Sequence, residues 1–328
     1  MTNNVSEPLT IEEIRNAASA LASRLHRTPI HSLHGAESQS EFGSQTQIHL
    51  KLELFQLTGT FKARGALLNM LRLTREEAAR GVTAISAGNH AIAVAFAARE
   101  LGVNAKVVMF SGANPLRIAL CEGYGAQIEF APNAHAGFQL VERIARDEGR
   151  TLIHPFEGRT TAMGTATLGL ELCEQLPDLD AVLVPIGGGG LCAGVSSAVK
   201  LLNPACRVFG VEPEGADSMY RSFQAGEPRS IERVATIADS LGAPYALPIS
   251  FEMCRRNVEE IVRVSDAQLR DAMRFLLRNA KLAVEPAGAA ATAALRGPLK
   301  ATLCGKRVAL IVCGSNIDAA TYAKLISE

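Results

Sequence analysis

Several features that mark other protein classes are missing from this sequence of 328 residues. Lysine plus arginine and aspartate plus glutamate both number 33, so the chain lacks the basic excess that is typical of nucleic-acid-binding proteins. No run approaches the roughly 20 apolar residues that span a bilayer, and residues 1–9 lack the apolar core of a signal peptide. We therefore expect neither a nucleic-acid partner nor a membrane partner.

The cysteines also form no recognisable framework. The chain has seven of them, without a Cys-x-x-Cys pair, and no His/Cys cluster has the spacing of a zinc site. An odd number of scattered cysteines indicates reduced thiols, so we expect a cytoplasmic protein. A Gly-x-Ser-x-Gly elbow is absent as well, which argues against a serine hydrolase of the α/β type.

Apolar strands alternate with helical stretches along most of the chain. Thr10 and Glu13 predict a capping box that opens a helix from Ile11 to about Arg24. Strands separated by helices predict an α/β fold whose mostly parallel sheets are covered on both faces. The predicted strands are residues 48–54, 82–85, 105–110, 126–131, 151–156, 181–186, 207–212 and 307–312.

A run of glycines, Gly187 to Gly190, lies between the apolar strand 181–186 and a helical segment. Glycines allow a tight turn that presents several N–H groups at a helix start, which favours binding of an anion, most naturally a phosphate. The lysine of a P-loop is absent, because Leu191 and Cys192 follow the glycines. The run by itself does not indicate which phosphate compound binds.

The same segment also fits a dinucleotide-binding fingerprint. Gly188, Gly190 and Ala193 have the required spacing, and Glu212 ends the next strand, where a ribose-binding acid is expected. From these residues alone, an NAD-dependent oxidoreductase therefore remains an alternative.

Three further segments place polar residues between a strand or loop and a helix. Lys62 could be a desolvated amine that forms an imine, although a solvated surface lysine is the common alternative. The amides of residues 86–90 could hold a carboxylate, and Asn89 could bind a hydroxyl or simply cap a helix. Residues 313–316 follow the last strand, where open α/β sheets place ligand contacts.

Together these segments resemble the fold-type II pyridoxal-phosphate (PLP) family of serine/threonine dehydratases and serine racemases, which has the fold of the tryptophan synthase β-subunit. The resemblance covers nearly the whole chain, with the segments in the family's order and spacing. It outweighs the dinucleotide interpretation, which explains only one segment. The matching segments are KLELFQLTGTFKARGA (51–66), SAGNHA (86–91), HPFEG (154–158), PIGGGGL (185–191), VEPEGAD (211–217), TIAD (236–239), VEPAGA (284–289) and CGSN (313–316).

The resemblance implies a catalytic lysine that forms a Schiff base with the cofactor, at Lys62. It implies that Phe61 lies against the pyridine ring and that Asn89 binds the ring hydroxyl. Cys313 occupies the position that faces the pyridine nitrogen, with Ser315 as the alternative. The implied cofactor-binding residues are Phe61, Lys62, Asn89, Gly187, Gly188, Gly189, Gly190, Leu191 and Cys313.

The resemblance also implies a loop that holds the substrate carboxylate. Related racemases carry a serine where this chain has Ala87, and alanine cannot transfer a proton, so racemisation is not expected. A divalent-cation site corresponds to Glu212 and the carbonyl of Ala216, but Ser218 replaces an acidic ligand there, which disfavours Mg²⁺ or Ca²⁺. The implied substrate-binding residues are Ser86, Ala87, Gly88, Asn89 and His90.

For the architecture, the resemblance implies two domains with twisted, mostly parallel sheets. Residues 1–58 and 152–328 would form a large PLP-binding domain, and residues 59–151 a small substrate-loop domain. Relatives are commonly dimers, so a homodimer is expected.

The implied activity is that of a dehydratase, or ammonia-lyase, of the L-threonine and L-serine type. It removes the α-proton and eliminates the β-hydroxyl of an amino-acid substrate, giving a 2-oxo acid and ammonia. Alternatives within the family are a lyase for phenylserine or 3-hydroxyaspartate, or a serine racemase. Residues 240–248 have few polar side chains, which favours a more apolar β-substituent, as in threonine or phenylserine.

Overall fold

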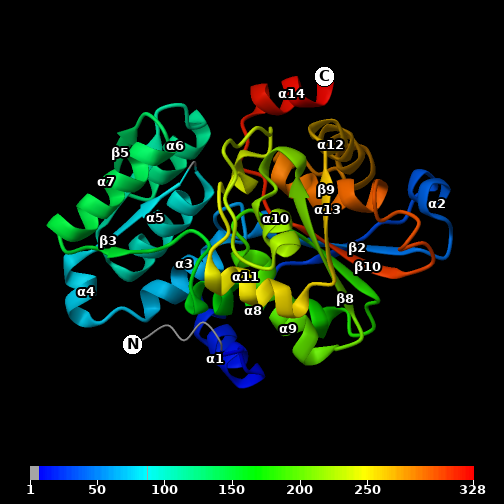
Figure 1. The fold of residues 1–328 in the computed structure, drawn as a ribbon, viewed down its shortest axis with the longest axis horizontal. Coiled ribbons are helices and arrows are strands. Elements are labelled where there is room, and N and C mark those ends of the chain that lie inside the picture. The colour runs from blue at the N-terminus through cyan, green and yellow to red at the C-terminus, as the bar shows by residue number, and fades with distance from the viewer. Residues whose placement is uncertain (1–6, 87) are drawn as a thin grey trace.

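The computed structural model describes residues 7–86 and 88–328 and contains two β-sheets within them (Figure 1). The larger sheet has six strands in the order β1-β2-β10-β7-β8-β9, and only the β1–β2 pair is antiparallel. The smaller sheet has four parallel strands in the order β5-β4-β3-β6. The strands are β1 (Ile30–Ser32), β2 (Gln47–Leu52), β3 (Val82–Ile85), β4 (Ala105–Phe110), β5 (Gln127–Ala131), β6 (Thr151–Leu152), β7 (Ala181–Pro185), β8 (Arg207–Pro213), β9 (Glu260–Val264) and β10 (Arg307–Val312).

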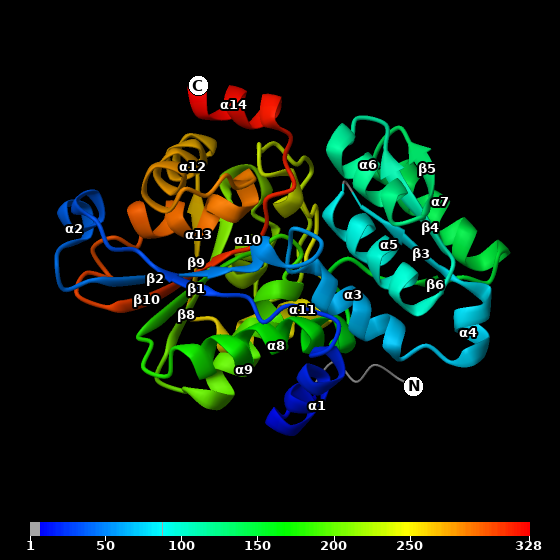
Figure 2. The same ribbon diagram turned by 180° about the vertical axis from the view of Figure 1, so that it is seen from behind.

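Helices surround both sheets, as parallel strands require. In Figures 1 and 2, α4 to α7 gather around the smaller sheet and α8 to α13 around the larger one. None of the described helices is long and apolar enough to cross a membrane. The helices are α1 (Ile11–Leu21), α2 (Ala36–Phe42), η1 (Glu53–Phe55), α3 (Lys62–Leu71), α4 (Arg75–Arg80), α5 (Asn89–Leu101), α6 (Pro115–Gly123), α7 (Ala134–Asp147), α8 (Arg159–Gln175), α9 (Gly190–Leu202), η2 (Glu214–Ala216), α10 (Ser218–Ala225), η3 (Asp239–Leu241), α11 (Pro248–Asn257), α12 (Asp266–Ala280), α13 (Pro286–Arg296) and α14 (Ala319–Ser327).

The smaller sheet is an insertion into the larger one. The chain leaves the larger sheet after β2, forms β3 to β6, and returns to the larger sheet at β7. The expected boundary between residues 151 and 152 falls inside β6, where both residues pair with β3. The division into a large domain (1–58 and 152–328) and a small domain (59–151) stays a prediction.

Most predicted strands match the structure, and the differences have local causes. Strands 82–85, 105–110 and 307–312 have the predicted bounds, and the Thr10–Glu13 capping box is present, although α1 already ends at Leu21. The strand predicted at 151–156 ends at Leu152. Pro155 lies further along that segment and has no backbone N–H group to donate to a neighbouring strand. The short edge strand β1 and the strand β9 were not predicted.

Helix α3 is held close to α8, and α8 close to α9, by glycines at the crossings. A Cβ atom on Gly164 of α8 would lie 2.7 Å from the Arg64 carbonyl oxygen of α3. A Cβ atom on Gly194 of α9 would lie 2.2 Å from the Ala162 carbonyl oxygen of α8. Any side chain would push these helices apart, because packed interiors leave little room for displacement. The close packing fixes the position of α3, whose first residue is Lys62.

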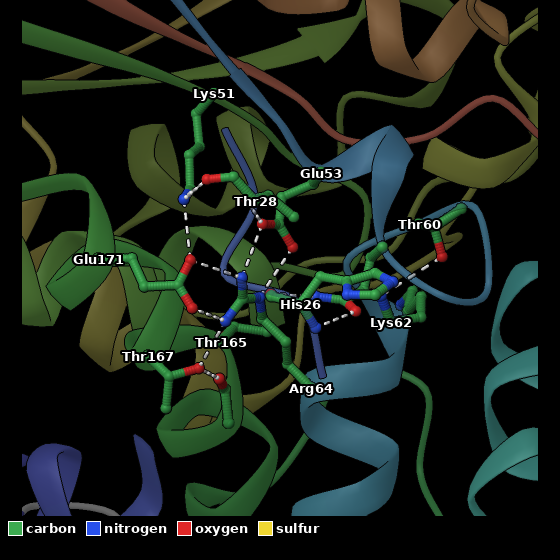
Figure 3. A network of polar contacts seen from close by, with 12 residues as sticks. His26, Thr28, Lys51, Glu53, Thr60, Lys62, Arg64, Thr165, Thr167 and Glu171 are labelled. Carbon is green, nitrogen blue, oxygen red and sulfur yellow. Dashed lines mark hydrogen bonds and ion pairs between the residues drawn. The ribbon is translucent and has the colours of Figure 1, made fainter. Parts of the chain in front are cut away.

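A buried ionic cluster includes Arg64, two residues after Lys62 on α3 (Figure 3). Arg64 forms bidentate pairs with Glu53 of η1 (Nε–Oε2 and Nη2–Oε1, both 2.8 Å) and with Glu171 of α8 (Nη1–Oε1, 2.8 Å; Nη2–Oε2, 2.9 Å). Its remaining N–H donates to the Thr167 hydroxyl at 3.1 Å. All five N–H donors of the guanidinium are therefore used, and the two carboxylates raise the pKa of Arg64 although burial opposes its charge.

Lys51 completes the cluster and balances its charge. Its ammonium donates to Glu171 at 2.8 Å, to Gln175 at 2.9 Å and to the Thr28 carbonyl oxygen at 2.8 Å. Two cations thus face two carboxylates, so the cluster carries no net charge inside the protein. Its members connect β2, η1, α3 and α8 at one point.

Replacing Arg64 by methionine should strongly destabilise the fold, because Glu53 and Glu171 would lose their bidentate partner. Removal of one partner from a buried ion pair costs about 3–5 kcal/mol of unfolding free energy. Denaturant unfolding followed by circular dichroism measures this loss. Arg27→Met removes the exposed pair with Glu174 and serves as the control, with an expected loss below about 1 kcal/mol. Equal losses for the two variants would contradict this account of the cluster.

Candidate active site

A cavity of about 800 Å³ lies between the two sheets. Its walls come from segments at the carboxyl ends of parallel strands, including Ser86 after β3, Phe110 of β4, Gly187 after β7 and Cys313 after β10. Open α/β sheets bind their ligands at this edge.

The structure brings nearly all of the predicted site residues together in this cavity. Phe61, Lys62 and Cys313 line it, as do the whole glycine run and Leu191. Ser86, Gly88, Asn89 and His90 line it as well, while Ala87 lies outside the described residues. Glu212, Ala216 and Ser315 are not among its lining residues. Their roles in binding stay predictions.

Lys62 is the first residue of α3, and its amine reaches a neutral acceptor. Nζ donates to the Pro155 carbonyl oxygen at 2.6 Å and lies 5.1 Å from the centre of the Phe61 ring. Desolvation lowers the pKa of Lys62 to about 8, against the opposing influence of Cys313 and Glu285. Lys62 therefore becomes an uncharged, nucleophilic amine at a much lower pH than an ordinary lysine does.

The glycine run forms a turn that accepts no side chains and leads into α9. A Cβ atom on Gly188 would lie 2.2 Å from the Phe156 ring, and one on Gly190 would lie 2.4 Å from the Phe156 carbonyl oxygen. Gly189, the N-cap of α9, has φ +95° and supplies no side-chain cap. The first amides of α9 thus begin at the cavity wall without a side-chain acceptor, which suits a bound phosphate.

Asn89 is held firmly by polar neighbours on both sides of its amide. Its Nδ2 donates to Glu285 at 2.7 Å and to Ser240 at 3.0 Å, and its Oδ1 accepts a hydrogen bond from Asn316 at 2.8 Å. Burial raises the pKa of Glu285, while the charge of Arg117 opposes that shift. Both N–H groups of the amide are therefore used, so a ring hydroxyl could reach only the second lone pair of Oδ1, and this role of Asn89 stays a prediction.

Arg117 of α6 joins the smaller sheet to the larger one beside Asn89. Its Nη1 donates to Asp239 at 2.6 Å, its Nη2 to Glu285 at 3.3 Å, and its Nε to the Asn316 carbonyl oxygen at 2.9 Å. A Cβ atom on Gly88 would lie 2.1 Å from Arg117 Cδ. Arg117 therefore supports both Asn89 and the loop that begins at Ser86.

The loop from Ser86 to His90 is shaped by its own hydrogen bonds. The Ser86 hydroxyl accepts hydrogen bonds from the amides of Gly88 (2.9 Å) and His90 (3.3 Å). The His90 ring bonds to the Ile153 carbonyl oxygen through Nε2 at 2.8 Å. Burial and the charge of Lys62 lower the pKa of His90 to about 3, so the ring is neutral at physiological pH and suits a structural role.

Cys313 lines the cavity with a protonated thiol. Burial raises its pKa well above the usual value, so the side chain stays uncharged. Its carbonyl oxygen accepts a hydrogen bond from the Phe61 amide at 3.2 Å, which ties β10 to the start of α3. Ser315, the alternative for the ring nitrogen, donates its amide to the Gly59 carbonyl oxygen at 3.1 Å. Of the two, Cys313 is the one that faces the cavity.

The groups at Glu212 do not fit a divalent cation. Both oxygens of this buried carboxylate accept backbone hydrogen bonds from α10, from Met219 at 2.9 Å and from Tyr220 at 2.7 Å. The Ser218 hydroxyl donates to the Ala243 carbonyl oxygen at 3.2 Å. Within residues 7–86 and 88–328, no cluster of three His, Cys, Asp or Glu residues could hold a metal ion. The same contacts separate Glu212 from the cavity, where a ribose-binding acid would have to lie.

Sequence reasoning missed several residues of the cavity wall. Glu285 lies in the VEPAGA segment, which matched the family without a role for the acid. Arg117 and Asp239 carry no local signal of an ion pair, because 122 residues separate them in the chain. Phe110, Phe138 and Tyr245 also line the cavity; only Tyr245 lies in a segment that was expected near the substrate.

Comparison with known proteins agrees with this geometry. The family model described as pyridoxal-phosphate dependent enzyme matches residues 21–314. Phenylserine dehydratase of Ralstonia pickettii is 58% identical over 279 residues, which cover 85% of this chain and 86% of that protein. L-threonine ammonia-lyase of Thermotoga maritima is 37% identical, over 98% of this chain and 79% of that protein. The solved structure of maize serine racemase has a TM-score of 0.91 and 33% identity, and the match covers 98% of each chain.

The fold and the cavity define an α/β protein in which a lysine and a glycine-rich turn line one cavity. The chain belongs to the pyridoxal-phosphate dependent enzyme family, and the predicted fold type II is confirmed. Its cofactor is pyridoxal phosphate. The NAD-dependent alternative, which the glycine run alone had left open, is therefore rejected. The residues fit this cofactor, because the Lys62 amine, whose pKa desolvation lowers to about 8, and the amides at the start of α9 line the same cavity.

The reactivity of Lys62 should report its lowered pKa in the cofactor-free protein. Amines are acetylated only as the free base, so labelling of Lys62 should reach half of its maximum near pH 8. Lys106 is the internal control, because its hydrogen bond to Glu148 raises its pKa. Brief acetylation across a pH series, followed by mass spectrometry of peptides, measures both residues in one sample. If Lys62 titrated together with Lys106, the proposed desolvation would be wrong.

Proposed function

We propose that this chain is a PLP-dependent dehydratase that converts a β-hydroxy amino acid into a 2-oxo acid and ammonia. The observation that carries the proposal is the Lys62 amine, with a pKa lowered to about 8, in a cavity shared with the glycine run and the Ser86–His90 loop. The relatives named phenylserine dehydratase and L-threonine ammonia-lyase support the same reaction class.

The binding groups orient the substrate for the loss of its α-proton. Bound pyridoxal phosphate would supply an electron sink for the negative charge that develops at the α-carbon of the substrate. The amides at the start of α9 hold the phosphate, and Asn89 holds the ring hydroxyl. The Ser86 hydroxyl accepts hydrogen bonds from two amides of the loop, and its own O–H would donate to the substrate carboxylate. The α-hydrogen then lies toward Lys62.

Lys62 accepts the α-proton at Nζ. Its lowered pKa makes the free amine available near neutral pH, which is the condition for an effective general base. The β-hydroxyl leaves as water, and hydrolysis of the product consumes one water, so the balance is a 2-oxo acid and ammonia. Cys313, kept as a neutral thiol by burial, supplies no counter-charge to the ring nitrogen, which favours prompt loss of the β-hydroxyl.

We also propose that the enzyme is a cytoplasmic homodimer. The seven cysteines are free thiols in the structure, as a reducing compartment allows. Phe55 and Leu57 are exposed hydrophobic residues (49% and 41%) just before α3, and a second copy of the chain would cover them. Light scattering after gel filtration should give twice the monomer mass, and thiol titration should count all seven cysteines. A monomer or a disulfide would contradict these two expectations.

Steady-state assays test the activity directly. Serine, threonine, phenylserine and 3-hydroxyaspartate are each supplied, and the 2-oxo acid and ammonia are measured together. We expect equal amounts of both products from at least one substrate. Lys62→Ala should lower the rate about 10³-fold, because it removes the general base. Lys106→Ala, at a site outside the cavity, should keep the full rate.

Two results would contradict the proposed reaction. The first is a Lys62→Ala variant that is as active as the unchanged protein. The second is an absence of 2-oxo acid with all four amino acids although the protein has bound its cofactor.

A further inference from the structure

A row of aromatic rings crosses the cavity between the two sheets. Phe138 of α7 packs against Tyr245, with ring centres 5.9 Å apart and planes tilted by 51°. Tyr245 in turn packs against Phe156, with ring centres 6.1 Å apart. All three residues line the cavity, and Phe138 and Tyr245 are only partly buried, so their rings contribute exposed apolar surface to it.

Phe138 is held in place by the helix that carries it. The preceding residue, Gly137, packs so closely that a Cβ atom there would lie 2.7 Å from Ile85 Cδ1 and 3.2 Å from the Phe110 ring. Phe110 and Phe138 pack together on the small apolar core formed by Ile85 and its neighbours. One side of the Phe138 ring is therefore fixed by the core beneath α7.

The aromatic row lies on the substrate side of the cavity. Ile85, which supports Phe138 and Phe110, directly precedes Ser86 and the loop proposed to bind the carboxylate. Tyr245 follows the segment with Ser240, whose hydroxyl contacts Asn89. Phe156 of the same row follows Pro155, whose carbonyl oxygen accepts a hydrogen bond from the Lys62 amine, so a β-substituent on an α-carbon at Lys62 would lie near these rings.

Charged groups also line the cavity, among them the exposed Glu232 and Arg233, but the aromatic row itself carries no charge. Arg117 is bound by Asp239 and Glu285, and the lowered pKa of His90, about 3, keeps that ring neutral. The polar group that Tyr245 adds is a phenol, and burial raises its pKa, so it too is uncharged. Aromatic rings attract a further ring through offset or edge-to-face contacts.

We propose that Phe138 and Tyr245, whose rings are already in contact, form one aromatic surface that recognises an aryl group on the β-carbon of the substrate. The inference rests on the proposed dehydratase function and narrows its substrate to β-aryl-β-hydroxy amino acids, with phenylserine as the simplest member. Because one ring belongs to the unit of the smaller sheet and the other to that of the larger sheet, the aryl group joins the two parts of the enzyme when it binds.

The test compares kcat/KM for phenylserine with kcat/KM for threonine in the same preparation. Phe138→Ala and Tyr245→Ala should each lower the phenylserine-to-threonine ratio about tenfold, because each removes one ring contact. Tyr245→Phe keeps the ring and should keep the ratio. A loss of folding or of cofactor would reduce both activities together, so the ratio isolates recognition of the aryl group.

Phe130→Ala is the matched control. Phe130 of β5 is in the same unit as Phe138 but is 50% exposed and lies outside the cavity lining, so its removal should leave the ratio unchanged. An unchanged ratio in Phe138→Ala, or a preference of the unchanged enzyme for threonine, would contradict recognition of the aryl group by this aromatic surface while the dehydratase function stands. Failure to form a 2-oxo acid from either substrate would contradict the function and the aryl recognition together.

Discussion

The bidentate pairing of Arg64 with Glu53 and Glu171 fixes the end of α3 on which the reactive amine lies. The guanidinium uses every donor it has, and Lys51 neutralises the remaining charge. A buried cluster of this kind holds its members in one geometry, because no partial arrangement satisfies the charges. Lys62, two residues before Arg64, lines the cavity, whereas Arg64 is not among the lining residues.

Lys51 and Lys62 differ in the groups that accept hydrogen bonds from their amines. Lys51 donates to a carboxylate, an amide oxygen and a carbonyl oxygen, whereas Lys62 donates to the carbonyl oxygen of Pro155. Desolvation lowers the pKa of both lysines, but the Glu171 carboxylate opposes that shift at Lys51. Lys51 therefore has a partner for its charged form, whereas the Lys62 amine donates to a neutral acceptor.

The sequence predicted the parts of this arrangement that depend on local patterns. Apolar strands, the Thr10 capping box and the glycine run before α9 are all contiguous in the chain, and the structure contains each of them. The pairing of Arg117 with Asp239 and Glu285, and that of Arg64 with Glu171, joins residues more than 100 positions apart. Such contacts depend on how the sheets pack, which no local pattern reveals.

Arg117 connects α6, beside the smaller sheet, to residues around the cavity that come from the larger-sheet part of the chain. Its guanidinium contacts Asp239, Glu285 and the Asn316 carbonyl oxygen, and all three of those residues belong to the part of the chain beyond β8. Glu285 and Asn316 are also the partners of Asn89. Any movement of α6 away from the larger sheet would therefore break the contacts that orient Asn89. The contacts of Arg117 and the orientation of Asn89 therefore depend on each other, and α7, which follows α6 and β5 in the chain, carries Phe138 into the lining of the same cavity.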